Sequence, residues 1–424
     1  MVEREKAVSQ SVRLAVQRQM DELVRGAAEV ITEDELEEKL TESVLEGRPL
    51  RVKEGTDPSR PDIHLGHAVT YRKLRQFQDF GHEVTFLIGD FTGMIGDPTG
   101  KNAARRALSR EEVNRNAETF ARQFYKILDP DRTRLRYNSE WLAKLSAEQL
   151  VQLASKYTVA RMLERDDFAR RFAENRPISI HEFFYPLFQG YDSVALHADV
   201  EVGGLDQKFN FIVGRELQRE YGQKPEVALM MPLLVGLDGV QKMSKSLDNY
   251  VGIEEPPAEM YGKIMSIPDV VMSDYYELAT DVPIAQVREI IAGLRAGELH
   301  PRDVKRRLAR EIVRMYHDER AAGQAEEAFD LVFKDHGIPE DVPEFRLGAD
   351  LLADDGEGVW VVRLLTATGL AASSGEARRL VAQGGVRING QPVTGVDTMI
   401  VPAPGDVIQA GKRRFARLVL GDKR

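Results

Sequence analysis

The sequence predicts an α/β fold: a doubly wound parallel sheet, followed by an all-helical domain and a small α+β module. Short β-rich runs alternate with helix-like runs from about residue 50 to residue 236. This alternation is typical of parallel sheets that helices cover on both faces. The strand-like runs stop after residue 250, and a short basic segment that mixes helix and strand closes the chain.

The predicted elements follow in chain order. Residues 1–48 show helical periodicity with dense charge, which predicts an N-terminal helical arm. The sheet domain is expected at 49–250, where β-rich runs begin at 50–57. Further strands are expected at 83–90, 133–139, 193–204 and 227–236. The intervening helices are expected at 68–81, 110–128 and 207–222.

Three segments complete the predicted organisation. Residues 251–340 are helical and rich in Arg and Glu, which predicts a separate helical domain. Residues 341–358 combine proline with acidic side chains, and we expect them to be a linker. Residues 359–424 form the small basic module.

Composition excludes several kinds of site. The chain has no cysteine, so disulfides and thiolate metal sites are impossible. No run reaches the roughly 18 apolar residues of a membrane helix, so we expect a cytoplasmic protein without membrane contact. From Val361 onward ten Lys and Arg stand against four Asp and Glu, whereas the preceding part has 48 against 64. This asymmetry indicates two kinds of partner, one of them polyanionic, or else a basic surface that is merely solvated.

Two histidines precede a predicted helix in the stretch PDIHLGHAVT. His64 and His67 would lie on one face near the helix start, where unsatisfied N–H groups favour a phosphate. Gly66 lets a flat group approach the backbone. The imidazoles can then donate hydrogen bonds to a polyphosphate whose charge grows during reaction. Zinc ligation and two structural histidines are the alternatives, although local spacing offers no third metal ligand.

A second motif, KMSKS at 242–246, follows the strand-like run MPLLVG. Lys242 and Lys245 flank small residues, including Ser244, on a predicted loop. Two flexible ammonium groups suit the outer phosphates of ATP. The sequence has no Walker A string and no G-x-G-x-x-G after a strand, so phosphates must be held in another way. A solvated lysine loop is the alternative.

Together, H-x-G-H and K-M-S-K-S resemble the paired motifs of the class I aminoacyl-tRNA synthetases. The resemblance implies a Rossmann-like catalytic domain that takes ATP with Mg²⁺ as a substrate. It implies no permanently bound metal or organic cofactor. By position in the motifs, the implied ATP-binding residues are Asp57, His64, Gly66, His67, Thr70, Asp206, Lys242, Ser244 and Lys245.

Three further stretches narrow the choice of amino acid. YPLFQGYDS places Tyr185, Gln189 and Asp192 on one face of a helix. GDFTGMIGDPTGK is a glycine-rich strand-to-loop turn that carries Asp97, and VGGLDQKFN (202–210) is a predicted helix start. A helix with three polar groups on one face makes a good ligand wall, although a solvated face is the alternative.

These stretches resemble the tyrosyl-tRNA synthetases from about residue 50 to the C-terminus. In that family Asp192 would accept a hydrogen bond from the substrate phenol, and Asp206 would bind ribose. The implied tyrosine-binding residues are Asp97, Tyr185, Gln189, Asp192 and Gln207. The implied catalytic residues, which would stabilise the departing pyrophosphate, are His64, His67, Lys101, Arg105, Lys242 and Lys245.

One departure places the chain in a subgroup. Some tyrosyl-tRNA synthetases carry a Tyr-Cys pair just before the G-x-D-P turn, but here Lys53 and Glu54 stand at those positions. The chain therefore resembles a bacterial subgroup that lacks this pair. The second partner of the substrate phenol stays unassigned.

The basic module combines a helix, a Gly-Gly turn and a strand at 373–393 with a basic strand at 407–420. It resembles the small RNA-binding fold shared by a ribosomal small-subunit protein, some pseudouridine synthases and bacterial tyrosyl-tRNA synthetases. Guanidinium groups on a helix start and a facing strand suit an RNA backbone of defined shape. The implied RNA-binding residues are Arg378, Arg379, Lys412, Arg413 and Arg414.

The resemblance implies a ligase that forms tyrosyl-adenylate from L-tyrosine and ATP and then charges the 3′ end of tRNA(Tyr). It implies a homodimer and no DNA partner. A tryptophan-specific synthetase and a non-catalytic RNA-binding relative are the alternatives. Asp192 and the basic module argue against the first, and the intact histidines and lysines argue against the second.

Overall fold

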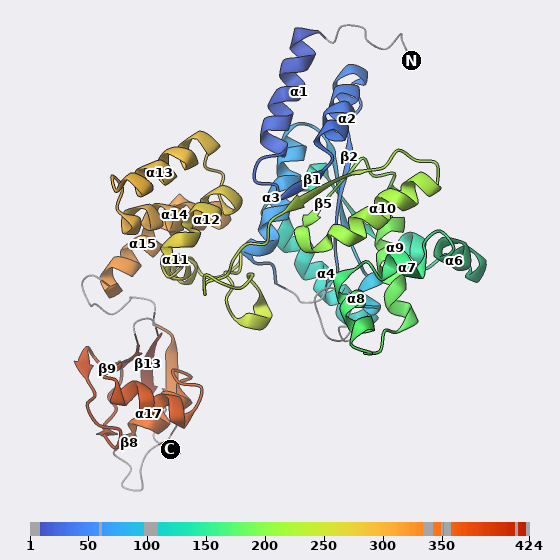
Figure 1. The fold of residues 1–424 in the computed structure, drawn as a ribbon. Coiled ribbons are helices and arrows are strands. Elements are labelled where there is room, and N and C mark those ends of the chain that lie inside the picture. Colours follow the sequence, from blue (N-terminus) through green and yellow to red (C-terminus); the bar gives the residue numbers. More distant parts are fainter. Residues whose placement is uncertain are drawn as a thin grey trace. The chain divides into compact units, whose positions relative to one another are not determined.

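The computed structural model describes residues 9–58, 62–96, 109–333, 342–348, 351, 358–411 and 414–420. The chain divides into two compact units. The first contains Met1–Glu255 and Lys263–Tyr316, and the second contains Pro256–Gly262 and His317–Arg424. Figure 1 labels many of their helices and strands.

The first unit is built on a six-stranded sheet, which confirms the predicted α/β class. In spatial order its strands are β1 (Glu29–Ile31), β6 (Val227–Met231), β5 (Val200–Gly204), β2 (Arg51–Thr56), β3 (Glu83–Ile88) and β4 (Thr133–Tyr137). All neighbours are parallel except β1, which runs antiparallel to β6. The carboxyl ends of the parallel strands therefore share one edge, where ligands bind in open α/β sheets.

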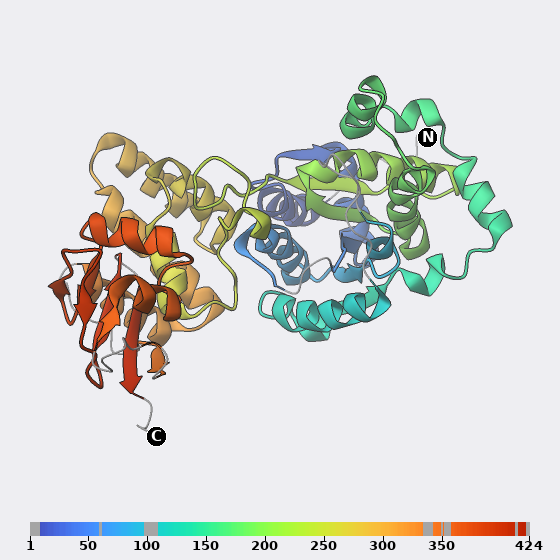
Figure 2. The same ribbon diagram turned by 90° about the horizontal axis from the view of Figure 1, so that it is seen from below.

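Helices alternate with these strands. The helices that flank the sheet are α1 (Gln10–Leu23), α2 (Glu33–Glu46), α3 (Leu65–Asp79), α4 (Arg110–Phe124), α9 (Ile180–Leu196) and α10 (Lys208–Glu220). Short helices connect β4 to α9 along the chain, in the teal and green part of the ribbon (Figures 1 and 2). They are α5 (Ser139–Leu142), α6 (Ala147–Ala154), α7 (Val159–Met162) and α8 (Asp166–Ala173).

Helices α9 and α10 touch backbone to backbone, because each has a glycine at the contact. A Cβ atom on Gly190 would lie 3.0 Å from the Cα of Gly214 and 2.9 Å from Cδ1 of Leu217. Only glycine at position 190 permits this approach. The contact fixes the position of α9 relative to the sheet. It therefore also fixes the positions of the side chains on α9.

Two predictions within the first unit are wrong. The predicted strand 193–204 begins as helix, because α9 continues to Leu196 and ends at His197, whose φ is 50°. Only Val200–Gly204 is strand. The N-terminal arm is helical as expected, but it also contains β1, an edge strand of the main sheet. Three residues are too few for a period-2 pattern to predict a strand.

The chain beyond the sheet is helical. The first unit holds α12 (Met272–Ala279), α13 (Ile284–Ala296) and α14 (Pro301–Tyr316), and the helices outside it or at its border are α11 (Pro257–Met265) and α15 (Glu319–Phe333). None of the described helices is long and apolar enough to cross a membrane.

The second unit contains a five-stranded sheet packed against two helices. The strand order is β10 (Gln391–Pro392), β9 (Val386–Ile388), β12 (Val407–Ala410), β13 (Arg414–Leu420) and β7 (Glu344–Leu347). The helices are α16 (Val361–Ala367) and α17 (Ser374–Ala382), and a two-stranded ladder joins β8 (Val359–Trp360) to β11 (Met399–Ile400). Leu364, Leu365 and Val381 pack with Ile408 and Leu418 in its core.

Two predictions for this unit are wrong. The segment 407–420 is two antiparallel strands rather than one, because the chain turns at Gly411, whose φ is 67°. The predicted linker 341–358 contains β7, which pairs in parallel with β13. A four-residue edge strand gives little sequence signal, since its partners lie about 70 residues away in the chain.

Candidate active site

The two histidines lie where the sequence predicted, at the start of α3. His64 is the residue before the helix, with extended backbone at φ −124°, and its main-chain N–H donates to Nδ1 of His67 at 3.3 Å. The two rings are 3.9 Å apart, centroid to centroid. A Cβ on Gly66 would lie 3.0 Å from the His64 ring, so glycine leaves this turn open beside the imidazole.

His64 is neutral in the folded protein. Burial, together with the nearby His67 and Lys245, lowers the pKa of His64 to about 2. Its Nδ1 is buried without a hydrogen-bond partner among the described residues. A neutral imidazole still has one N–H to donate. His64 therefore suits hydrogen bonding to a phosphate better than ion pairing with one.

The KMSKS loop meets this helix start. Main-chain hydrogen bonds join Leu65 N–H to the Val251 carbonyl at 2.9 Å and Ile253 N–H to the Ile63 carbonyl at 3.1 Å. Met243 is buried, and its Cβ lies 3.4 Å from where a Cβ on Gly66 would stand. Two motifs that are 175 or more residues apart in sequence therefore form one site.

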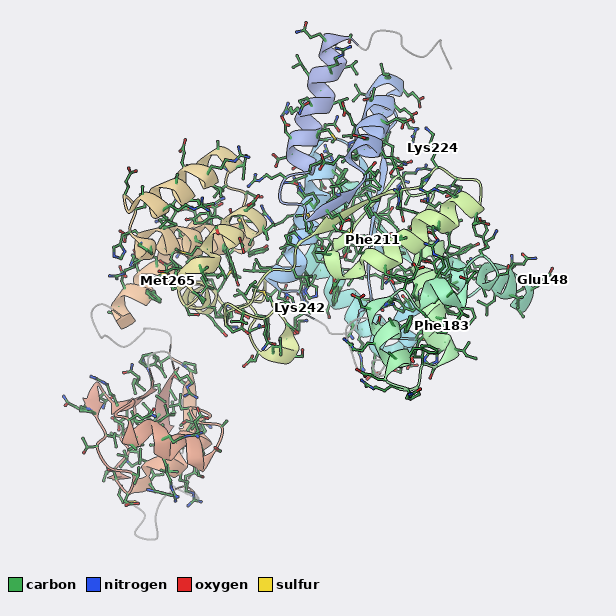
Figure 3. All side chains as sticks on the ribbon, in the orientation of Figure 1. Glu148, Phe183, Phe211, Lys224, Lys242 and Met265 are labelled. Carbon is green, nitrogen blue, oxygen red and sulfur yellow. The ribbon has the colours of Figure 1, made fainter. Side chains whose placement is uncertain are left out.

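The loop's polar side chains bond to neighbours in this site. Lys242 Nζ donates to Oδ2 of Asp206 at 3.1 Å, so a predicted phosphate ligand and a predicted ribose ligand lie side by side (Figure 3 labels Lys242). Lys245 Nζ donates to the main-chain carbonyl of Asp62. Ser244 opens a short 3₁₀ turn, and its N–H donates to Asn249 at 2.8 Å.

Asp206 and Gln207 lie just after β5, at the carboxyl edge of the sheet. Two glycines precede them, and a side chain on either would collide. A Cβ on Gly203 would lie 2.6 Å from Oε1 of Gln207, and one on Gly204 would lie 2.6 Å from Oδ1 of Asp206. The glycines thus let both polar side chains fold back over the strand end.

A cavity beside this edge brings together three polar residues of α9. Tyr185, Gln189 and Asp192 all line it, as the helical spacing predicted. Asp57, which was expected among the ATP ligands, also lines it. Its carboxylate accepts hydrogen bonds from Tyr185 Oη at 2.9 Å and Thr92 Oγ1 at 2.7 Å.

Asp192 is the most deeply placed carboxylate of this cavity. It is 3% exposed, and burial raises its pKa to about 7. Trp141 Nε1 donates to Oδ1 at 2.7 Å, and Asn138 Nδ2 donates to Oδ2 at 3.2 Å. Sequence reasoning missed both donors. The available signal was their place just after β4, at the carboxyl end of a parallel strand.

A buried network supports Gln189. Its Nε2 donates to Oε1 of Glu201 at 3.2 Å, and its Oε1 accepts from Asn210 at 2.8 Å. Glu201 also forms an ion pair with Lys53, at 2.8 Å between Nζ and Oε1. Both ionic side chains are 1% exposed. Lys53, like Asp192, lines the cavity.

The other predicted site residues are distributed as follows. Thr70 lies on α3, where its hydroxyl donates to the His67 carbonyl at 2.9 Å. Arg378 and Arg379 are exposed on α17, and Arg378 lies 5.4 Å over the Trp360 ring. Arg414 pairs with Glu376 at 3.0 Å. The residues outside the described part are Asp97, Lys101, Arg105, Lys412 and Arg413.

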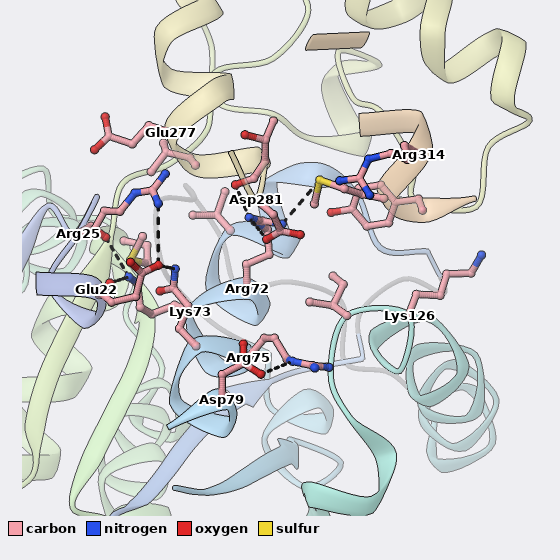
Figure 4. Close-up of a pocket in the computed structure, with 18 residues that line it drawn as sticks. Glu22, Arg25, Arg72, Lys73, Arg75, Asp79, Lys126, Glu277, Asp281 and Arg314 are labelled. Atoms are coloured by element: carbon pink, nitrogen blue, oxygen red, sulfur yellow. Dashed lines mark hydrogen bonds and ion pairs between the residues drawn. The ribbon is translucent and has the colours of Figure 1, made fainter. Parts of the chain in front are cut away.

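A larger cavity, of about 440 Å³, lies on the far half of α3 (Figure 4). Some of its charged side chains are paired with one another: Arg72 with Asp281 at 2.5 Å, and Arg75 with Asp79 at 2.9 Å. Lys73 donates to two main-chain carbonyls of the α1 end. None of the predicted site residues that the structure describes lines this cavity. Among the described residues no group of three or more His, Asp or Glu could hold a metal ion.

The chain is similar in sequence to known protein families and to individual proteins. Residues 45–334 match the model of the class I tRNA synthetases (W and Y), and residues 359–408 match the S4 domain. The tyrosine–tRNA ligase of Moorella thermoacetica is 59% identical, covering 95% of this chain and 96% of that protein. That of Syntrophotalea carbinolica is 57% identical, covering 97% and 100%.

Solved structures are similar in fold. The tyrosyl-tRNA synthetase of Archaeoglobus fulgidus, complexed with L-tyrosine, has a TM-score of 0.58 at 26% identity and covers 72% of this chain and 99% of that one. A truncated mitochondrial tyrosyl-tRNA synthetase of Aspergillus nidulans has a TM-score of 0.62 at 20% identity, covering 76% and 99%. By family match and by identity over nearly its whole length, the chain belongs to the class I tRNA synthetases and, within them, to the bacterial tyrosine–tRNA ligases.

Proposed function

We propose that this chain activates L-tyrosine with ATP and transfers the tyrosyl group to the 3′ end of tRNA(Tyr). In the first step the tyrosine carboxylate attacks the α-phosphorus of ATP in line, which gives tyrosyl-adenylate and pyrophosphate. In the second step a ribose hydroxyl of the tRNA attacks the adenylate, which gives Tyr-tRNA and AMP. The observation that carries tyrosine specificity is the buried carboxylate of Asp192, held in the cavity that Tyr185 and Gln189 also line.

The substrate supplies its own nucleophile, so the first step needs no general base. Its acceleration comes from positioning and from donors at the reacting phosphates. We assign His64, His67, Lys242 and Lys245 to that task, and the adjoining motifs support this assignment. On the basis of the sequence, we assign Lys101 and Arg105 to the same task. ATP enters as its magnesium complex, as a substrate.

We assign the remaining ligands by the same reasoning. ATP would be held by Gly66, Thr70, Asp206 and Ser244, and by Asp57 at the border of the tyrosine cavity. Tyrosine would be bound by Tyr185, Gln189, Asp192 and Gln207, with Asp97 added from the sequence. The Lys242–Asp206 hydrogen bond, at 3.1 Å, supports one continuous nucleotide site.

The tRNA would be bound in part by the S4 domain. Exposed Arg378 and Arg379 on α17 and Arg414 on β13 offer guanidinium groups to phosphates, and the sequence adds Lys412 and Arg413. Charged tRNA is consumed where proteins are made, so we place the reaction in the cytoplasm.

We also propose that the chain works as a homodimer. Helices α6 to α9 carry four large apolar side chains that are at least 62% exposed: Val151, Val159, Phe172 and Ile180. The contact between two copies would bury these side chains, and apolar surface that forms a continuous patch is typical of protein interfaces. We expect the mass of a dimer in light scattering at micromolar concentration, and a monomer mass would contradict this proposal.

The test of the function is ATP–pyrophosphate exchange with tyrosine, phenylalanine and tryptophan in parallel. We expect exchange with tyrosine alone. Exchange with tryptophan would keep the activation chemistry and overturn the assignment of Asp192. No exchange with any of the three would leave a non-catalytic RNA-binding protein.

A further inference from the structure

The cavity at Asp192 has a second buried charge on its wall. Lys53 lies on β2 and is 1% exposed. Lys53 and Gly55 are two residues apart on this strand, so both point to the same face of the sheet. Both line the cavity together with Asp192 on α9. The sheet and the helix thus present an ammonium and a carboxylate to one small space.

The Lys53 ammonium has hydrogen-bond donors to spare. Lys53 and Glu201 are register partners on neighbouring parallel strands, and their charged atoms lie 2.8 Å apart. Beyond this ion pair, Nζ has no hydrogen-bond partner among the described residues. An ammonium carries three N–H donors. A buried charge with unused donors is costly, so such groups normally satisfy a partner.

Lys53 keeps its charge in this setting. Burial alone would lower its pKa, but the carboxylates of Glu201, Glu226 and Asp192 outweigh burial and raise it. Glu201 is in turn shared with Gln189, whose Nε2 donates to it at 3.2 Å. The ammonium is therefore fixed in place by a carboxylate that also positions a predicted tyrosine ligand.

The substrate side chain needs both groups. A phenol hydroxyl donates one hydrogen bond and accepts others at its oxygen. Asp192, as a carboxylate, can only accept. Trp141 and Asn138, the two donors that lie beside Asp192, already donate to its two oxygens. The phenol oxygen therefore needs a different donor. Among the described residues that line the cavity, Lys53 is the one that carries an ammonium.

We propose that Lys53 is the second hydrogen-bond partner of the substrate phenol, donating from Nζ to the phenol oxygen while Asp192 accepts the phenol hydrogen. This inference rests on the proposed tyrosine specificity. It makes Lys53 a specificity residue: phenylalanine would leave a buried ammonium as well as a buried carboxylate without a partner.

The test compares two substrates in two enzymes. In Lys53→Met, kcat/KM for tyrosine in pyrophosphate exchange should fall by about 10- to 100-fold, because one charged hydrogen bond is lost. The value for phenylalanine should rise, because phenylalanine never makes that bond and its binding no longer leaves a buried ammonium without a partner. The tyrosine-to-phenylalanine ratio therefore falls. A purely structural role would lower both values together and leave the ratio unchanged, which would overturn the proposal.

A second variant protects the test against misfolding. Lys53→Met leaves Glu201 buried and unpaired, whereas Lys53→Met with Glu201→Gln removes both charges. The double variant should show the same fall in the ratio, and Glu201→Gln alone a smaller one. Lys224→Met, at an exposed ion pair with Glu42, is the matched control and should behave as wild type (Figure 3 labels Lys224).

Exchange by the wild type and by the Lys53 variants separates the proposed function from the role of Lys53. Wild type without tyrosine-dependent exchange would overturn the proposed function, and this inference with it. An active wild type whose folded Lys53 variants keep the full tyrosine-to-phenylalanine ratio would overturn only the role of Lys53.

Discussion

The indole Nε1 of Trp141 donates a hydrogen bond to Oδ1 of Asp192 at 2.7 Å. Trp141 comes from α5, directly after β4, and Asp192 from the middle of α9. The bond therefore ties the carboxylate to a different element from the helix that carries it. A buried carboxylate that is held from two sides keeps a fixed orientation and still has lone pairs to accept a hydrogen bond, so a substrate with a hydroxyl can satisfy it and one with a hydrogen atom in that place cannot.

Trp141→Phe tests this bond. The change removes one donor and keeps an aromatic ring, so we expect KM for tyrosine to rise by about 10-fold while KM for ATP stays the same. Pyrophosphate exchange at varied tyrosine measures it. Trp360→Phe is the matched control, because its indole donates to the Val396 carbonyl in the S4 domain at 2.7 Å. Equal effects from both changes would contradict the prediction.

His67→Ala tests the phosphate site. We expect the rate of tyrosyl-adenylate formation to fall by about 10² or more, the size typical of a lost transition-state donor. Tyrosine affinity should hardly change, because His67 is not among the residues of the Asp192 cavity. Stopped-flow or quenched-flow measurement of activation separates the two quantities. His181→Ala, at an exposed histidine, is the control. An unchanged activation rate would remove His67 from the site.

Tyrosine binding should depend on pH through Asp192. Its pKa is raised to about 7 by burial, against the pull of Lys53 and of the Trp141 and Asn138 hydrogen bonds, while Glu201 raises it further. Below pH 7 the group is protonated and accepts the phenol hydrogen less well. We therefore expect tyrosine to bind more weakly at pH 6 than at pH 8 when ATP is absent. Equilibrium dialysis at both values measures it, and equal affinity would contradict it.

The same shift affects stability in a defined direction. An Asp whose pKa rises from about 3.9 unfolded to about 7 folded binds more protons when folded. Its contribution to stability is therefore full below pH 4 and is lost as pH rises through 7. Asp192→Asn should flatten this part of the stability-against-pH curve, which denaturant unfolding at several pH values would show.

Arg378→Ala with Arg379→Ala tests the RNA surface. If both guanidinium groups contact phosphates, KM for tRNA should rise in the double variant. The slope of the logarithm of the tRNA binding constant against the logarithm of salt concentration should also decrease by about one unit for each contact removed. Pyrophosphate exchange should not change, since it does not require tRNA. Arg13→Ala, at an exposed arginine of α1, is the control. An unaltered slope would remove the two residues from the interface.

Gly190→Ala tests the contact between α9 and α10. A Cβ there would lie 3.0 Å from backbone, so we expect the midpoint of thermal unfolding to fall, with a cost of about 1–3 kcal/mol. Gly262→Ala is the matched control. It is also a helical glycine, but a Cβ there meets nothing within 4 Å, so alanine should stabilise the helix by up to about 1 kcal/mol. Shifts of the same sign in both variants would contradict this account.

Local patterns predicted the parts of the site that lie on one element. The helical spacing of Tyr185, Gln189 and Asp192 predicted a shared face, and in the structure all three line one cavity. The two ATP motifs were predicted to act together, and in the structure Met243 of the KMSKS loop lies next to Gly66 at the start of α3. These predictions needed only the helical repeat of the side chains or a short sequence motif.

The remaining parts depend on which strands become neighbours. Asn138 and Trp141 reach Asp192 only because β4 lies at its place in the sheet, and Lys53 meets Glu201 only because β2 pairs with β5. Nothing in the local sequence near Lys53 reveals that register. Short strands such as β1 and β7 were missed for the same reason, since their partners are distant in the chain.

The three residues of β1 have a consequence for solubility. They cover the open side of β6, whose five residues are all buried and apolar. An uncovered strand of that composition is a template on which other chains can add and aggregate. A three-residue strand is too short to offer the same template itself. The N-terminal arm thus protects the sheet, and removing residues 1–32 should produce a protein that precipitates as it folds.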